Sequence, residues 1–146
     1  MAQTSDSLAT RLAITHYDFD PDSANATDVA WVDMNGFDKI IVSFFRTVGT
    51  GALDTFALIG NSASDGSGTD VTLVTHAVGS EPDAVGDYIF LECNVQQMAQ
   101  EAADSGNDVR YVSVSAEFAT ATDEGVVTYI RSATRAYDGL TADSIA

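Results

Sequence analysis

The sequence predicts an all-β fold: a β-sandwich of the jelly-roll kind, with about seven or eight strands and one short helix. Three observations lead to this prediction. Short runs rich in β-branched and aromatic residues are separated by clusters of Gly, Pro, Asn and Asp. Residues 110–118 alternate apolar and polar side chains, and only residues 94–106 carry helix signals. Many short strands with little helix favour two packed sheets.

The clearest strand is the run at 109–118. Val112 and Val114 lie on one face of it, and the serines between and after them lie on the other, which is the pattern of a half-buried strand. After the acidic turn at 122–125, a second β-branched run covers 126–135. We expect the two runs to pair as an antiparallel hairpin at the centre of a sheet.

The other predicted strands are, in order, 11–17, 29–33, 39–48, 53–60, 71–78 and 88–93. The run 39–48 is apolar on both faces, with Ile40 and Val42 on one face and Ile41 and Phe45 on the other. Such a strand is central in its sheet or is covered by a partner subunit. We expect residues 53–78 to form a hairpin with a long tip.

One helix is expected after Asn94, which is a good N-cap residue and has Gln97 three positions later. Val95 and Met98 begin a mildly apolar face at helical spacing, and Gly106 is a typical C-terminal stop. Because the helix is short, it should cover one end or one face of the sandwich.

A chain of 146 residues is the size of one domain and buries roughly 68–70% of its unfolded surface. We expect a flexible N-terminal arm at 1–10, the sandwich at 11–137 and a C-terminal tail at 138–146. The N-terminal residues lack the features of a signal peptide, and no apolar run approaches the roughly 18 residues of a membrane helix. We therefore expect a soluble product that is made in the cytoplasm.

The charge is strongly negative, with 22 acidic and 6 basic residues and a formal net charge of -16. Such a surface repels phosphates and anionic lipids, so nucleic-acid and membrane partners are not expected. Three interpretations remain open: an ordinary acidic domain, adaptation to salty surroundings, or a basic partner.

Few residues are of types that act in catalysis or metal binding, and we expect no catalytic residue, no metal site and no cofactor. Cys93 lies in an apolar run, which favours a small buried hydrophobe over a reactive thiol. His16 and His76 have no partner at metal-ligand spacing. The loop at 65–70 offers oxygen donors for calcium, but it lacks the pattern of an EF-hand loop and is better explained as a hairpin tip.

An interface with a partner is predicted around the last strand, since Arg and Tyr are favoured anchors at interfaces. The candidate residues are Arg131, Arg135, Tyr137, Tyr129, Arg11 and Phe45. The alternative, equally favoured for the arginines of the last strand, is that they pair with carboxylates of the same domain.

The segments 54–61, 108–113 and 128–131 give the chain a resemblance to small virion proteins of tailed bacteriophages. Within that group it looks most like the capsid decoration (cement) proteins. The resemblance implies a non-enzymatic protein that binds the outer surface of a phage capsid and stabilises the shell by bridging capsomers. It also implies a homotrimer whose partner is the major capsid protein, and it supplies no catalytic residues.

Other functions remain open at this stage. A phage tail or head-tail connector component would have much the same composition. A soluble carbohydrate- or calcium-binding β-sandwich module, or a small hydrolase, would belong to a different class.

Overall fold

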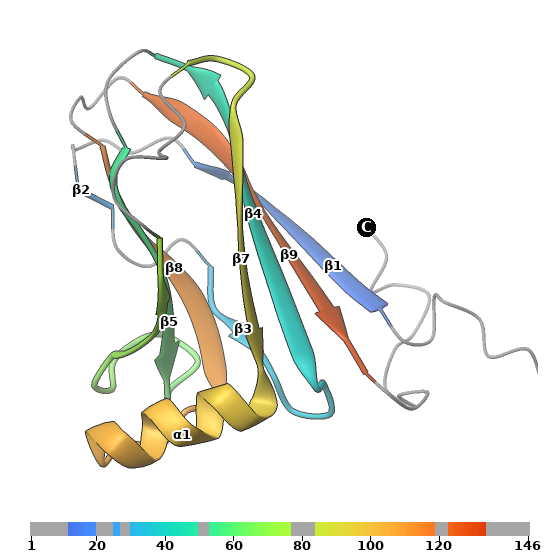
Figure 1. Cartoon of the computed structure of the whole chain (residues 1–146), viewed down its shortest axis with the longest axis vertical. Helices are drawn as coiled ribbons and strands as arrows, with labels where there is room; N and C mark the ends of the chain where they lie inside the picture. Colours follow the sequence, from blue (N-terminus) through green and yellow to red (C-terminus); the bar gives the residue numbers. More distant parts are fainter. Residues whose placement is uncertain are drawn as a thin grey trace, which may run out of the picture.

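The computed structural model describes residues 12–19, 25–26, 30–49, 53–76, 84–118 and 123–133. Two antiparallel sheets pack face to face (Figure 1). Sheet 1 consists, in spatial order, of β1 (Leu12–Phe19), β9 (Glu124–Ser132), β4 (Lys39–Val48) and β7 (Tyr88–Asn94). Sheet 2 consists of β2 (Asn25–Ala26), β8 (Tyr111–Phe118), β5 (Leu53–Asn61) and β6 (Val71–Thr75), and β3 (Val32–Asp33) also pairs with β8.

The strand order is that of a jelly roll. The chain changes sheet between most successive long strands, and β5 and β6 are the long strands that are consecutive in the chain and paired in one sheet. The short strands β2 and β3 both pair with β8 and share one strand position, which gives eight positions in two sheets. The predicted fold class, with about seven or eight strands and one short helix, is confirmed.

The predicted hairpin of the two runs within 109–135 is wrong. β8 pairs with β5 in sheet 2, whereas β9 pairs with β1 and β4 in sheet 1. The alternation of apolar and polar residues indicates which face of a strand is buried, but it does not indicate which strand lies beside it. Each run is central, as predicted, but in its own sheet.

The core lies between the two sheets. Ile40, Val42 and Phe44 of β4 are fully buried, and they face a buried set on sheet 2 that includes Val114. The ring of Phe44 packs against that of Phe56, with 5.8 Å between centroids. Burial of each such side chain stabilises the fold by about 1.5–3 kcal/mol.

Two further predictions about strands are confirmed. β4 lies between β9 and β7 and is therefore central in sheet 1. β5 and β6 form the expected antiparallel hairpin, with the long tip at 62–70.

The helix α1 (Val95–Ser105) lies across one end of the sandwich (Figure 1). Its caps are the predicted ones, because the Asn94 side chain accepts a hydrogen bond of 2.8 Å from the backbone N–H of Gln97, and Gly106 adopts a left-handed conformation. Among the described residues, no helix is long and apolar enough to span a membrane. The predicted arm at 1–10 and tail at 138–146 lie outside the described residues.

Candidate interaction surface

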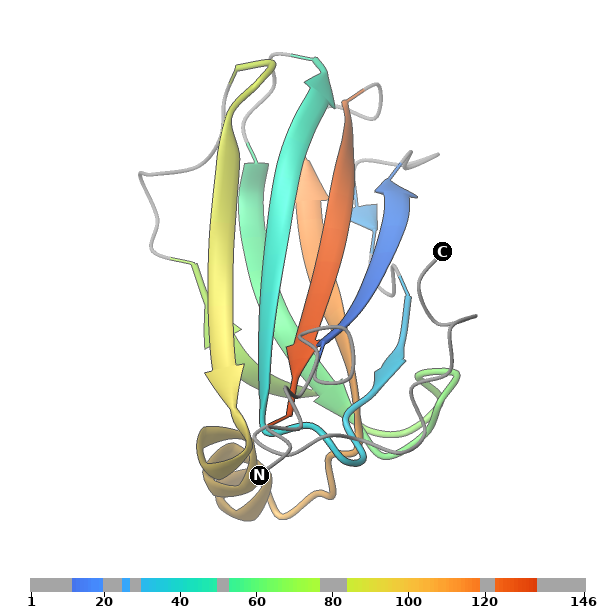
Figure 2. The same cartoon turned by 90° about the vertical axis from the view of Figure 1, so that its right-hand side faces the viewer.

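The outer face of sheet 1 exposes large apolar side chains. Figure 2 looks onto this face, where β7, β4, β9 and β1 lie side by side. Of the seven exposed large hydrophobic residues in the described part of the chain, six belong to sheet 1 or to the turn before β7. They are Ile14, Phe45, Val48, Val85, Tyr88 and Phe90. Contiguous exposed apolar side chains of this kind mark interaction surfaces.

Three aromatic side chains form a cluster on this face, and we call Phe45, Tyr88 and Phe90 the aromatic cluster. Phe45 lies directly opposite Tyr88 in the β4–β7 register. The rings of Tyr88 and Phe90 meet edge to face, with 5.3 Å between centroids. The three side chains are 44%, 64% and 58% exposed, although aromatic residues are normally the largest contributors to cores and interfaces.

An aliphatic row continues the apolar surface toward β1. The register places Ile14, Ile130 and Ile41 opposite one another across three adjacent strands. Ile14 is exposed, and the other two are half-buried by their neighbours. The outer face of sheet 1 therefore carries apolar side chains on all four strands.

The same face carries little net charge. Lys39 and Glu92 form an ion pair of 2.6 Å between Nζ and Oε1, and their strands are adjacent. His16 Nδ1 and Thr128 Oγ1 are 2.9 Å apart. Glu124, at the start of β9, is the remaining charged residue at the described outward positions. The described side chains of this face thus carry little net charge, in a chain whose formal charge is -16.

The predicted interface residues differ in how exposed they are in the structure. Phe45 belongs to the aromatic cluster, whereas Tyr129 is fully buried in the core. Arg131 is half-buried, donates a hydrogen bond of 2.6 Å to the backbone carbonyl of Asp33 and stacks over the ring of Phe37. The remaining candidates, Arg11, Arg135 and Tyr137, lie outside the described residues. Their contacts with a partner stay predictions.

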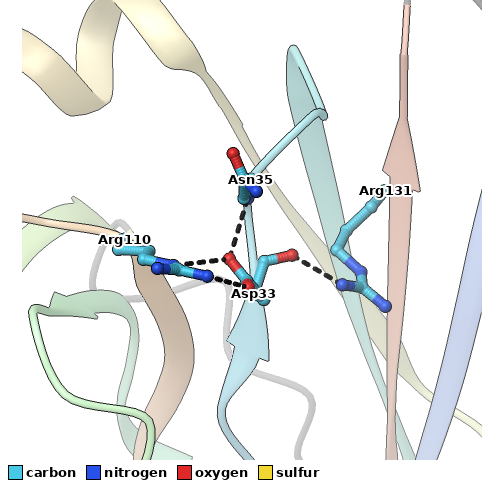
Figure 3. A network of polar contacts seen from close by, with 4 residues as sticks. All are labelled: Asp33, Asn35, Arg110 and Arg131. Carbon is cyan, nitrogen blue, oxygen red and sulfur yellow. Dashed lines mark hydrogen bonds and ion pairs between the residues drawn. The ribbon is translucent and has the colours of Figure 1, made fainter. Parts of the chain in front are cut away.

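A polar network joins the two sheets near α1 (Figure 3). Arg110 donates two hydrogen bonds to the carboxylate of Asp33, of 3.2 Å from Nε and 2.8 Å from Nη2, and the backbone N–H of Asn35 donates a third. The hydrogen bond from Arg110 is the main cause that lowers the pKa of Asp33, with Asn35 adding to it. Because Arg131 binds the carbonyl of the same Asp33, the network ties β3 to both sheets. Its role is to hold the fold together.

A buried ion pair lies within the sandwich. The Arg46 guanidinium donates to the carboxylate of Asp123, and both side chains are almost fully buried. Gly49 lies directly against Asp123, where any added Cβ would overlap the carboxylate. Arg46 alternates with Phe45 along β4, so the same strand places a charge inside and an aromatic ring outside.

Several described residues of catalytic or metal-binding types make local hydrogen bonds or are buried. In the described ranges, no group of three or more His, Cys, Asp and Glu gathers where it could hold a metal ion. In the loop once considered for calcium, Asp70 accepts a hydrogen bond from Asn61, and Asp65 accepts one from the backbone N–H of Ser67. Burial raises the pKa of Cys93 to about 11, with the Glu101 carboxylate adding to the shift.

Sequence reasoning missed Tyr88 and Phe90. The signal available was their spacing, since they alternate with Ile89 and Leu91 along β7. Both sets are apolar, so the sequence alone leaves open which set faces outward. The buried Ile89 and Leu91 in the structure decide it.

Comparisons with known proteins do not assign a function to this surface. No protein-family model and no curated protein matches the chain. Among solved structures, the SPBc2 prophage-derived protein YomS is similar at a TM-score of 0.47 and 12% identity, covering 83% of this chain and 95% of that one. A chain from a study of Bacillus endospore appendages, described as disulfide-linked pili, is similar at a TM-score of 0.36 and 13% identity, covering 92% and 100%. Scores this low carry no argument about function.

Proposed function

We propose that this protein is a non-enzymatic structural protein of a phage virion, which binds the outer surface of the capsid as a homotrimer. The observation that carries the proposal is the apolar outer face of sheet 1, whose described side chains carry little net charge in a strongly acidic chain. A protein that works by association needs such a face, and a soluble monomer does not. The jelly roll is compatible, because viral capsid domains use it, but a fold by itself assigns no function.

The proposed mechanism uses binding energy alone. A subunit that bridges neighbouring capsomers adds buried area across their joint and raises the free energy needed to separate them. A homotrimer engages a repetitive lattice through several contacts at once, so each contact can be weak. The partner on the shell is the major capsid protein, and acidic parts of this chain would meet basic patches on it. In that case binding weakens as salt screens the charges.

The experiment is to compare virions that carry the protein with virions that lack it. We expect particles without the protein to assemble but to lose their DNA at lower temperature and under milder osmotic shock. Electron microscopy of complete virions should locate the protein on the outside of the head. Finding it in the tail or at the head-tail connector would overturn capsid binding in favour of the alternative phage component.

A carbohydrate-binding module is the second candidate, and the aromatic cluster favours it. Lectin domains also use jelly rolls, and Ser43, which lies opposite Phe90, and Thr128, on the next strand, place hydroxyl groups on the same face. A glycan array is the test, with Tyr88→Ala as the control variant. A sugar bound by the wild type and lost in the variant would replace the virion proposal; calcium titration monitored by thermal melting tests the calcium version in the same way.

A further inference from the structure

We propose that the outer face of sheet 1 is the surface on which a second copy of this chain docks, with the aromatic cluster at the centre of the contact. This inference rests on the proposed function, because it names the partner that covers this surface in a self-assembling structural protein. Four features of the described residues support a second copy as the occupant: composition, charge, area and the edge of β7.

The composition of the face is that of an interface core. Phe45, Tyr88 and Phe90 are enriched residue types at such cores, and charged residues are depleted there, as they are on this face. Aromatic anchors near the centre of a contact supply most of the binding free energy. The apolar side chains of β1, β9 and β4 extend the contact beyond the cluster.

The charge distribution selects the occupant. Two copies that each carry a formal charge of -16 repel one another, and the repulsion is smallest where unpaired charge is least. On this face Lys39 and Glu92 neutralise each other. A basic capsid surface would be attracted to acidic regions elsewhere. A near-neutral apolar face therefore fits a like-charged copy better than it fits a basic partner.

The area of the face is close to what a specific contact needs. Four strands about 4.8 Å apart, with seven residues of β7 at about 3.3 Å each, span roughly 19 Å by 23 Å, or about 450 Å² in projection. Two copies would together bury roughly 900 Å² on flat geometry, and the relief of the side chains adds to it. This is close to the approximately 1,000 Å² that a biological interface should exceed.

The edge of β7 also calls for a neighbour. β7 ends the strand order of sheet 1, and within the described residues no strand pairs with its outer edge. Natural edge strands are protected by Pro, Lys, bulges or short length. β7 has seven residues without Pro or Lys, and its register with β4 runs without a bulge from Asn94 to Tyr88. A second copy whose contact extends from the aromatic cluster past β7 would cover this edge as well.

The test is the oligomeric state of the double variant Tyr88→Ser/Phe90→Ser, measured by size-exclusion chromatography with light scattering over a range of concentrations. We expect self-association about 30-fold weaker or more than in the wild type, as for the loss of an anchor pair. Val95→Ser is the matched control, because Val95 is 44% exposed but lies on α1. It should assemble as the wild type does.

Circular dichroism and thermal melting of dilute protein establish that the double variant is folded. Should it fail to fold, Phe90→Glu provides the second variant, since it adds like charge to the face and should also weaken assembly. The inference is overturned if the wild type is a monomer at all concentrations, or if folded variants of this face assemble as the wild type does.

The outcome separates this inference from the proposed function. The capsids for this comparison are purified from particles that lack the protein. If the wild type assembles through this face but does not bind these capsids, the inference stands and the proposed function is overturned. A dimer in place of a trimer keeps the interface and overturns the proposed stoichiometry. A capsid-bound protein whose folded face variants self-associate normally keeps the proposed function and overturns the inference.

Discussion

The two sheets of the sandwich differ most on their outer faces. On sheet 1, Phe45, Tyr88 and Phe90 are exposed. On sheet 2, the outward side chain of Ile59 is only 5% exposed, and the outward Tyr111 is half-buried. The same fold therefore has one outer face whose large apolar residue is already covered within the subunit and another whose aromatic residues remain open.

The covered face has features that the open face lacks. Trp31, which precedes β3, packs against Gly66 in the loop between β5 and β6. A side chain at Gly66 would collide with the indole, and its positive φ of 71° also favours glycine. Outward residues such as Ser113 and Ser115 are small. Ile59 on sheet 2 is thus buried by its own chain, whereas the aromatic cluster on sheet 1 is exposed in the subunit and is the surface that the proposed second copy would cover.

The largest expected effect sharpens the contrast between the inner and outer faces of a single strand, β4. Replacing the buried Arg46 by Met leaves Asp123 as an uncompensated buried charge, and we expect a loss of about 3–5 kcal/mol in the free energy of unfolding. Lys39→Met breaks the exposed pair with Glu92 and should cost about 1 kcal/mol or less. Urea denaturation of both variants measures the difference. Equal losses would contradict the assigned burial.

The next effect compares the two outer faces directly. Ile59→Ala should lower the free energy of unfolding by about 2–4 kcal/mol, because it removes a buried side chain. Phe90→Ala should change the stability of dilute, unassembled protein by about 0.5 kcal/mol or less, because the ring is exposed there. Denaturation at low and at high protein concentration gives both values. A neutral Ile59→Ala would break the comparison.

The two sides of β7 can be compared by thiol chemistry. With its pKa raised to about 11, the Cys93 thiol has roughly 100-fold less thiolate at pH 8 than a thiol with the ordinary pKa of 9.0, so native protein should react slowly with iodoacetamide. Unfolding in urea should restore the rate. A cysteine introduced as Phe90→Cys should react rapidly in dilute protein and slowly in the assembly. Rapid labelling of Cys93 in the native protein would contradict its burial on the inner face of β7.

The smallest effect concerns the network that ties the sheets together. Asp33→Asn removes a carboxylate whose pKa is lowered by Arg110, and we expect a loss of about 1 kcal/mol or less at pH 7, since the pair is partly exposed. A lowered pKa stabilises the fold above the ordinary value of 3.8, and this contribution disappears as the pH falls below it. Wild type and variant should therefore converge in acid. A difference that persists once the pH is too low for Asp33 to be ionised in the folded protein would point to a cause other than this ion pair.

Most of the fold could be predicted from the sequence because it is encoded locally. Alternation in β8 and the capping residues Asn94 and Gly106 act within a few residues, and the structure has them as expected. The pairing of β8 with β9 was predicted wrongly because strand neighbours depend on contacts that are distant in sequence. The sheet order follows from the register of the whole sandwich.

The interaction surface could be predicted only in part, for a related reason. Phe45 was identified because β4 is apolar on both faces, which a sequence displays directly. Tyr88 and Phe90 were missed because their outward direction is fixed by pairing with β4. Tyr129 belongs to the inward set of β9, and its burial likewise depends on register with β1 and β4.

Hydroxyl-radical footprinting, comparing assembled protein with dilute protein, tests most directly whether another molecule covers sheet 1. We predict that Tyr88 and Phe90 are oxidised rapidly in the dilute protein and are protected on assembly, while the exposed Val95 on α1 is oxidised equally in both. Equal oxidation of Tyr88 and Phe90 in the two states would contradict an intermolecular role for this face.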